Sequence, residues 1–225
     1  MKYTSYNDDE LIRTIADCEK EVPCYTRIIR IIRDIPADYI KSGSHRSNLR
    51  EDVDKYQKDR GVKQIDIRAR EIRDKEIIPE DYLLTETRYE TARGTEMFLQ
   101  FENKNDNLLA GFLRLRLPKR DSDNKEMRDD LSLRDEELNK YENLKVLIDS
   151  AIVRELHVYG SLKRIGEIGN QSQHTGMGKR LLARAEEIAR ENGYKRLSII
   201  SGVGVREYYK KRGYELEGTY MVKNL

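Results

Sequence analysis

A loop punctuated by glycines that runs directly into an amphipathic helix restricts the fold of this sequence more than any other feature. The loop is Gln173-His174-Thr175-Gly176-Met177-Gly178. Over residues 178–192 apolar side chains then recur at helical spacing, with Gly193 as a stop signal; the apolar face consists of Leu181, Leu182, Ala185, Ile188 and Ala189. This arrangement predicts a junction between a strand-side loop and a helix in a mixed α/β protein.

The start of such a helix can hold an anion. Its first backbone N–H groups have no partner within the helix and carry a partial positive charge, and glycines let the backbone approach a ligand closely. We expect Lys179 and Arg180 to add positive charge just inside the helix. The pattern is neither a dinucleotide fingerprint nor a loop ending in Gly-Lys-Ser/Thr. Taken alone, it also fits an ordinary tight turn.

The elements around the loop predict a mixed sheet with a cleft. Alternating apolar residues at 97–101 and 113–117 flank the turn-rich run 103–107, so we expect an antiparallel hairpin there. The other expected elements are strands at 150–159, 196–201 and 216–223 and a short helix at 205–212. The strand at 150–159 breaks simple alternation, because it carries polar groups on what should be one face.

The first part of the chain predicts a separate segment, and we place the boundary near residue 80, giving segments 1–80 and 81–225. Asn7 and Glu10 form a capping box before a helical apolar stripe. Residues 25–36 are rich in β-branched side chains and predict a strand that Pro36 ends. Ser47 is expected to cap a second helix, which stops at Gly61.

Composition narrows the function classes. Charged residues make up 37% of the chain, yet the formal net charge is only +2, so overall charge does not indicate a nucleic-acid binder. No apolar run approaches the roughly 18 residues that a membrane span needs, and no signal-peptide pattern is present, so we expect a cytoplasmic protein without a membrane partner. Two cysteines and three histidines lack metal-ligand spacing, and no metal site is expected.

Residues 118–145 form a charged insertion, more than half of it Asp, Glu, Lys or Arg. We interpret it as a solvated surface loop with a short helix near residues 134–141. A lid over the active site is the alternative.

Longer strings in the chain resemble a known family. The order of strand, Gln-x-x-Gly-x-Gly helix, strand and Tyr-x-x-x-Gly-Tyr is similar to the GNAT acetyltransferase pattern, with Tyr209 to Gly213 and Tyr214 as its last part. More closely, the chain resembles the Elp3 family, the catalytic subunit of Elongator. The resemblance rests on Arg154-Glu155-Leu156-His157-Val158-Tyr159-Gly160, on residues 173–178, 200–206 and 213–223, and in the first third on Tyr25-Thr26-Arg27, Arg33-Asp34-Ile35-Pro36 and Ser47-Asn48-Leu49-Arg50.

The resemblance implies a fold and an activity. It implies a GNAT-type mixed sheet with flanking helices that binds acetyl-CoA, preceded by an α/β remnant of a radical-SAM domain. In this family tRNA triggers acetyl-CoA cleavage, and the acetyl unit serves to build a carboxymethyl-type group on C5 of the wobble uridine. The cysteine motif for an iron–sulfur cluster and SAM is missing from the sequence. We therefore expect neither of these cofactors nor the radical step from this chain alone, and the sequence resembles a fragment, a truncation or a split subunit.

Several residues take roles from the GNAT resemblance. The strand residues Glu155, Leu156, His157 and Val158 resemble the strand whose main chain pairs with the pantetheine arm. Glu155 could act as a base or could be a buried glutamate paired with an arginine. Tyr209 stands at the position of the tyrosine beside the thioester sulfur, where a phenol can protonate the leaving thiolate. Tyr208 is the second candidate, and we expect one of these two tyrosines to pack in the core.

A basic cluster in the first third is the candidate tRNA contact; it consists of Arg27, Arg30, Arg33, Lys41, Arg46 and Arg50. Composition alone favours a solvated charged face, since many acids lie nearby, and the Elp3 resemblance reverses that preference. Relatives carry cysteines near the position of residues 64–70 whereas this chain has none there, so a structural zinc is not expected.

The resulting hypothesis is the acetyl-CoA-binding module of an Elp3-like tRNA-modifying acyltransferase, with tRNA and acetyl-CoA as partners and a separate radical-SAM polypeptide or Elongator-like subunits as further ones. Two alternatives stay open. One is a free-standing GNAT that acetylates lysines or small amines, and the other is a non-catalytic tRNA-binding fragment.

Overall fold

The computed structural model describes residues 4–32, 35–73, 77–119, 140, 142–159 and 176–225. The chain divides into two compact units, 1–71 and 72–225. The division falls nine residues before the boundary expected from the sequence. Ile72 already belongs to the second unit, because it is 3% exposed in that unit's core and its N–H donates to the carbonyl of Leu109.

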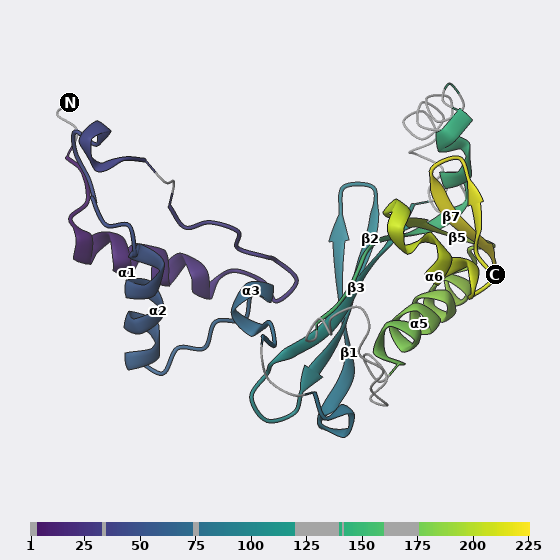
Figure 1. Cartoon of the computed structure of the whole chain (residues 1–225), viewed down its shortest axis with the longest axis horizontal. Helices are drawn as coiled ribbons and strands as arrows, with labels where there is room; N and C mark the ends of the chain where they lie inside the picture. Colours follow the sequence, from purple (N-terminus) through teal and green to yellow (C-terminus); the bar gives the residue numbers. More distant parts are fainter. Residues whose placement is uncertain (1–3, 33–34, 74–76, 120–139, 141, 160–175) are drawn as a thin grey trace. The chain divides into compact units, whose positions relative to one another are not determined.

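A seven-stranded mixed sheet forms the second unit, in the order β1-β2-β3-β4-β5-β7-β6 (Figure 1). The strands are β1 (Tyr82–Thr91), β2 (Gly94–Asn103), β3 (Leu109–Pro118), β4 (Ser150–Val158), β5 (Arg196–Ile200), β6 (Glu215–Glu217) and β7 (Tyr220–Asn224). Only the β4–β5 pairing is parallel. The expected mixed α/β fold is confirmed, and it is consistent with a GNAT-type sheet.

The hairpin of β2 and β3 has the predicted turn. Asn103 accepts backbone N–H bonds through its side chain, and Asn107 takes a left-handed conformation with φ 64°, which Asn tolerates better than most residues. β1 was not predicted from the sequence. Its burial alternates between half-buried and exposed positions, as on an edge strand, so apolar residues do not mark it out.

Helix α5 (Met177–Glu191) packs its apolar side on the sheet, as the sequence predicted. Its buried residues join one core with β2, β3, β4 and β5, including Leu99, Leu113, Val153 and Leu197. Helix α6 (Arg206–Lys210) follows β5. The single closing strand expected at 216–223 is two strands, because Gly218, with φ 59°, turns the chain between β6 and β7.

The first unit contains α1 (Asp8–Lys20), α2 (Leu49–Asp59) and the short α3 (Ile67–Arg70). The capping box of Asn7 and Glu10 is present at the start of α1. The helices α1 and α2 bury a small cluster, and Ile31 and Ile32 pack against it. The strand predicted at 25–36 was wrong for the part that the structure describes. β-branched residues favour a strand only where a partner strand can pair, and here they cover a helix pair instead.

Among the described residues no helix is long and apolar enough to cross a membrane. The same residues contain no group of His, Cys, Asp and Glu side chains suited to a metal ion. Of the charged insertion, the described part includes the end of β3 and the 3-10 helix Glu142–Leu147, and the helix expected near 134–141 lies almost entirely outside it.

Candidate functional site

An irregularity in β4 turns its second half toward a pocket. β3 and β4 pair in antiparallel fashion, and the register shifts after Arg114, which lies opposite Glu155, while Leu115 lies opposite Val153. Arg154 is therefore the extra residue of a β-bulge. A bulge changes the alternation, so the face that carries Val153 before it carries Leu156 after it.

The same bulge separates β4 from its parallel neighbour. β4 pairs with β5 only from Ser150 to Val153. Within the described residues, positions 155–158 of β4 pair with β3 on one side, and positions 154–158 have no strand on the other. A strand edge with free N–H and C=O groups can pair with an extended ligand.

Helix α5 begins beside this edge. Its N-cap is Gly176, which takes the left-handed conformation with φ 73°, and the cap has no side-chain hydrogen bond. In the part of the chain that the structure describes, no side chain caps the first N–H groups of α5, and such groups can bind an anion. Of the predicted loop, Gly176, Met177 and Gly178 are seen at this junction, whereas residues 173–175 lie outside the described residues. Met177 is buried in the core and cannot contact a ligand through its side chain.

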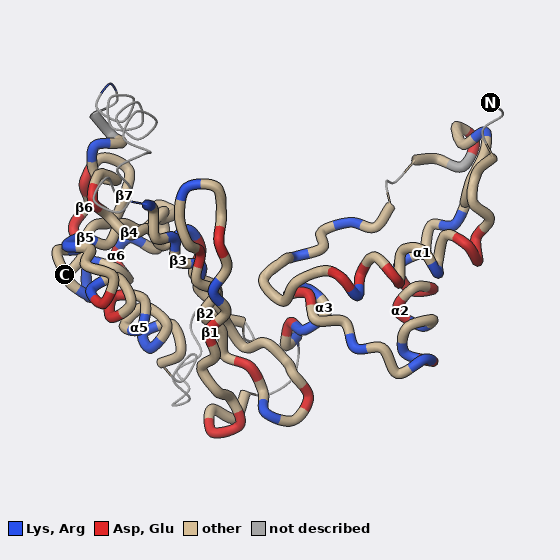
Figure 2. The backbone as a smooth tube through the Cα atoms, turned by 180° about the vertical axis from the view of Figure 1, so that it is seen from behind, with Lys and Arg blue, Asp and Glu red and all other residues tan. Residues whose placement is uncertain are grey.

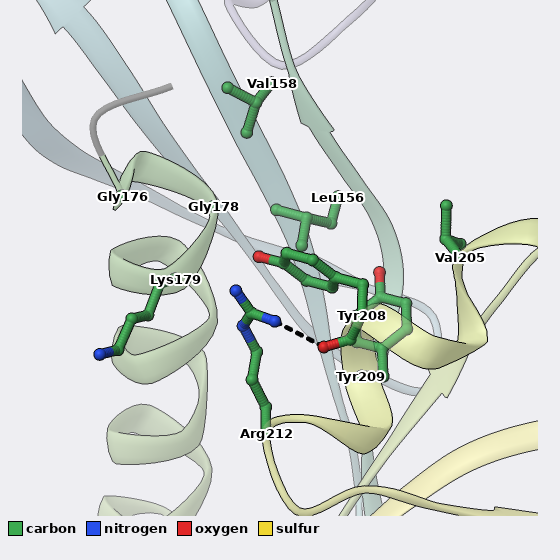
Figure 3. A pocket seen from close by; sticks show the side chains of 9 residues that line it. All are labelled: Leu156, Val158, Gly176, Gly178, Lys179, Val205, Tyr208, Tyr209 and Arg212. Atoms are coloured by element: carbon green, nitrogen blue, oxygen red, sulfur yellow. Dashed lines mark hydrogen bonds between the residues drawn. The ribbon is translucent and has the colours of Figure 1, made fainter. Parts of the chain in front are cut away.

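A pocket of about 510 Å³ joins these elements (Figure 3). β4 contributes two apolar side chains, the first turn of α5 contributes a backbone edge and a lysine, and the α6 region contributes two tyrosines and an arginine. The described lining residues are Leu156, Val158, Gly176, Gly178, Lys179, Val205, Tyr208, Tyr209 and Arg212. The structure thus brings residues of β4, of the start of α5 and of α6, all of them candidates from the sequence, to one pocket.

Both candidate tyrosines line the pocket, and they point in different directions (Figure 3). Tyr209 is only 6% exposed, and burial raises the pKa of its phenol to about 12. Tyr208 is half-buried, and its hydroxyl approaches the α5 start so closely that a Cβ placed on Gly178 would lie 2.9 Å from it. The two rings meet edge to face at 5.1 Å. Tyr209 is the one packed in the core, where it also contacts Tyr214, but it keeps access to the pocket.

Arg212 is a lining residue that the sequence analysis did not single out. Its guanidinium lies 3.5 Å from the ring centroid of Tyr208, and its Nη1 donates to the Tyr208 carbonyl oxygen at 2.5 Å. The spacing from Tyr208 to Arg212 is four residues, which places the two on one side of a helical turn. That spacing was the sequence signal for it.

On β4, two predicted binding residues do not line this pocket. Glu155 lies opposite Arg114 on β3, and its Oε2 accepts from the Nε of Arg114 at 3.0 Å. His157 is exposed and stacks on Phe112 with ring centroids 5.9 Å apart. Glu155 and His157 alternate with Leu156, so they face the other side of the sheet. The ion pair matches the structural interpretation of Glu155 except that the carboxylate is 44% exposed rather than buried.

Lys179 and Arg180, the two basic residues of α5 that were predicted to add positive charge to the anion site, also point away from the tyrosines. The ammonium group of Lys179 points away from Tyr208 and Tyr209 (Figure 3). Arg180 lies over the ring of Phe101 at 4.7 Å. The cation that contacts a pocket tyrosine is therefore Arg212 on the α6 side.

The candidate tRNA residues fall into two groups. Three are held by neighbours: Arg27 pairs with Glu71, Arg46 pairs with Asp8 and Asp52, and Arg50 donates to the carbonyl of Ile28. Arg30 and Lys41 are exposed and have no ion pair among the described residues, and Arg33 lies outside those residues. In Figure 2 the positions of basic and of acidic residues are interspersed along the backbone of α1 and α2.

Comparison with known proteins relates the chain to Elongator complex protein 3 and to a tRNA uridine(34) acetyltransferase. No family model matches the chain. It is 39% identical over 230 residues to Elongator complex protein 3 of Danio rerio, and that alignment covers 100% of this chain and 38% of the relative. It is likewise 39% identical to the tRNA uridine(34) acetyltransferase of Methanocaldococcus jannaschii, again over the whole chain and 39% of the relative.

A solved structure agrees. Elp3 of Methanocaldococcus infernus, with residues 1–46 deleted, matches with a TM-score of 0.73 and 35% identity over 98% of this chain. The chain is a homologue of the C-terminal portion of Elp3. The resemblance seen in the sequence is thereby confirmed. The chain spans about two fifths of the length of the curated Elp3 relatives and 49% of the solved chain.

Proposed function

We propose that the second unit binds acetyl-CoA and is the acyltransferase part of an Elp3-type enzyme that acts on uridine 34 of tRNA. The observation that carries this proposal is the pocket where the unpaired edge of β4, the start of α5 and Tyr209 meet. The name of the M. jannaschii relative, a tRNA uridine(34) acetyltransferase, supplies the proposed substrate.

The pocket suits each part of acetyl-CoA. An extended pantetheine arm can pair with the β4 edge at residues 154–158 as an added strand would. The pyrophosphate fits the N-terminus of α5, where backbone N–H groups and the helix dipole favour negative charge. Leu156 and Val158 give the arm an apolar wall. In this arrangement Glu155 and His157 contribute main-chain groups, since their side chains face away.

Tyr209 is the proposed residue beside the thioester sulfur. Burial raises its pKa to about 12, so the phenol stays protonated at neutral pH. A free thiol has a pKa of about 8.5, so complete proton transfer from this phenol to the thiolate is unfavourable at equilibrium. Tyr209 therefore acts by donating a hydrogen bond to the sulfur as negative charge develops, and solvent supplies the proton that finally remains on the thiol.

We further propose that the first unit corresponds to the end of the radical-SAM domain of Elp3 and contacts tRNA. The homology with Elp3 over the whole chain supports this assignment. Arg30 and Lys41 are the best placed for phosphate contacts, because their charges are exposed and not neutralised by a described partner. Arg46 is a weaker candidate, since two carboxylates already hold it.

The test is the release of free CoA thiol from acetyl-CoA, measured with and without tRNA. We expect tRNA to stimulate release and Tyr209→Phe to reduce it by roughly 10²- to 10³-fold, the range for a lost hydrogen-bond donor to developing negative charge. Tyr220→Phe is the matched control, because Tyr220 lies on β7 and does not line the pocket. Turnover of peptide amines that is indifferent to tRNA would instead identify a free-standing N-acetyltransferase.

A further inference from the structure

Arg212 is held at the pocket by two contacts. The guanidinium carbon lies 3.5 Å from the centroid of the Tyr208 ring, and Nη1 donates to the Tyr208 carbonyl oxygen. The Tyr208 hydroxyl in turn points toward Gly178, the second residue of α5 (Figure 3). Arg212 and Tyr208 therefore form one unit that faces the start of α5.

Most hydrogen-bonding capacity of Arg212 is unused. A guanidinium has five N–H donors, and the hydrogen bond to Tyr208 is the one that Arg212 makes among the described residues. Its Nε is shielded from solvent and has no partner there. A buried donor without an acceptor is energetically unfavourable. Such a group is suited to an anionic ligand that brings oxygen acceptors into the pocket.

The negative charge of the expected ligand is a second argument for Arg212. A pyrophosphate diester carries two negative charges, whereas a helix N-terminus supplies the equivalent of about half a positive charge. The ammonium of Lys179 points away from the tyrosines, and Arg180 lies on Phe101. Arg212 lines the pocket and contacts Tyr208, the α6 tyrosine whose hydroxyl lies beside the start of α5.

We propose that Arg212, together with the hydroxyl of Tyr208, binds the pyrophosphate of the acyl-CoA from the α6 side, opposite the N–H groups of α5. This inference rests on the proposed acetyl-CoA function. It adds Arg212 and Tyr208 to a site that the sequence assigned chiefly to main-chain donors, with Lys179 and Arg180 adding charge. It also separates the tyrosines, with Tyr208 serving the phosphates and Tyr209 the thioester.

A purely structural role is the competing explanation. The bond from Arg212 to the Tyr208 carbonyl satisfies an orphan group at the end of α6, and stacking on Tyr208 fixes that side chain. This role predicts a loss of folding stability, or an equal loss of affinity for every ligand. A phosphate contact predicts a loss only for ligands that carry the pyrophosphate.

The experiment measures dissociation constants of the full chain for CoA, dephospho-CoA and acetyl-pantetheine, which lacks both phosphates. Arg212→Gln should weaken CoA and dephospho-CoA by roughly 10- to 100-fold and leave acetyl-pantetheine within twofold, as expected for a charged hydrogen bond. Arg212→Lys should restore part of the affinity. Lys211→Gln removes the same charge from the next residue, which does not line the pocket, and should have little effect. Melting temperatures of all variants report folding.

Three outcomes would overturn the inference. Unchanged CoA affinity in Arg212→Gln would exclude the contact. An equal loss for all three ligands would make Arg212 a shaping residue, and a loss confined to CoA would place it at the 3′-phosphate. If wild type binds CoA normally, any of these refutes the inference alone. If wild type binds no CoA, the proposed function fails and the inference fails with it.

Discussion

Tyr209 has the electrostatic setting of a hydrogen-bond donor that never ionises in the working range. Burial and the neighbouring Tyr208 raise its pKa, Arg212 lowers it, and the balance is about 12. The protonated form is the donor, so its contribution persists below the pKa and is lost only as the pH rises toward 12.

The expected result is a tRNA-stimulated rate of CoA release whose kcat shows no falling limb assignable to Tyr209 between pH 7 and pH 9.5. The measurement compares the pH profile of the wild type with that of Tyr209→Phe, whose rate should be lower by a constant factor over this range. A falling limb near pH 8.5 that appears in the wild type and vanishes in the variant would contradict the assignment. It would mean that the phenol ionises far more easily than its burial allows.

At the same scale, the sequence could predict Tyr208 and Tyr209 as candidate site residues but not which of the two is buried. Their order along the chain identified them as pocket residues. Which of the two is buried depends on the rotation of α6 against the sheet, and that is set by contacts with Tyr214 and the core rather than by the helix itself. Arg212 was not singled out from the sequence, although its spacing of four residues from Tyr208 was a signal that the two lie on one side of a helical turn.

At the scale of elements, the junction of β4 with α5 depends on Gly178. A Cβ there would lie 2.9 Å from the Tyr208 hydroxyl and 3.4 Å from Val158, whereas the backbone itself has no need of glycine. We expect Gly178→Ala to keep or slightly raise stability, because alanine favours a helix by about 1 kcal/mol. Affinity for CoA should nevertheless fall several-fold, since Tyr208 must move.

The control for Gly178→Ala is Gly204→Ala, because a Cβ on Gly204 meets no atom within 4 Å. Calorimetric titration with CoA and thermal unfolding of both variants provide the measurement. Equal affinity in both would show that the Tyr208 position does not matter for binding.

One buried carboxylate connects three neighbouring strands of the sheet. Glu96 on β2 is 1% exposed, and its Oε1 accepts from Arg116 on β3 and Arg154 on β4, each at 2.9 Å. Arg154 is the bulged residue, so this ion pair holds the bulge in place. We expect Glu96→Gln to lower the free energy of unfolding by about 1–3 kcal/mol, since two charged hydrogen bonds lose their ionised acceptor.

Urea denaturation followed by circular dichroism measures this loss, with Glu187→Gln as the control. Glu187 is 57% exposed and pairs within α5, so its loss should cost less than about 0.5 kcal/mol. A similar cost in both variants would refute the role assigned to Glu96. The break in alternation at Arg154 and Glu155 was visible in the sequence, but its partner across two strands was not, because register between strands is a tertiary property.

At the scale of the whole molecule, the elements that could be predicted are those whose stability is local. The capping box at Asn7 and the apolar face of α5 each follow from short-range rules, and both are present. The segment 25–32 shows the opposite case, because its β-branched residues need a partner strand that the first unit does not offer among its described residues. Ile31 and Ile32 pack on the α1–α2 pair instead.

The basic residues of the first unit allow a test of which of them contact tRNA. Arg30 and Lys41 are exposed without a described ion pair, while Arg46 bridges Asp8 and Asp52 at 2.7 and 2.6 Å. Each lysine or arginine that contacts a phosphate releases counterions when tRNA binds. Its removal therefore reduces the magnitude of the negative slope of log affinity against log salt concentration by about 1. We expect the double variant Arg30→Gln/Lys41→Gln to weaken tRNA binding and to lower this slope by about 2.

Arg46→Gln is the matched control, because it removes a charge from the same unit that carboxylates already neutralise. We expect Arg46→Gln to change the magnitude of this slope by less than about 0.5. Its main effect should be to weaken the contact between α1 and α2, and thermal unfolding measures that loss of stability. Filter binding at four salt concentrations gives the slopes. If Arg46→Gln reduced the salt dependence as much as the double variant does, the ion pairs of Arg46 would have to open when tRNA binds. Arg30 and Lys41 would then not be distinguished from Arg46 as tRNA contacts.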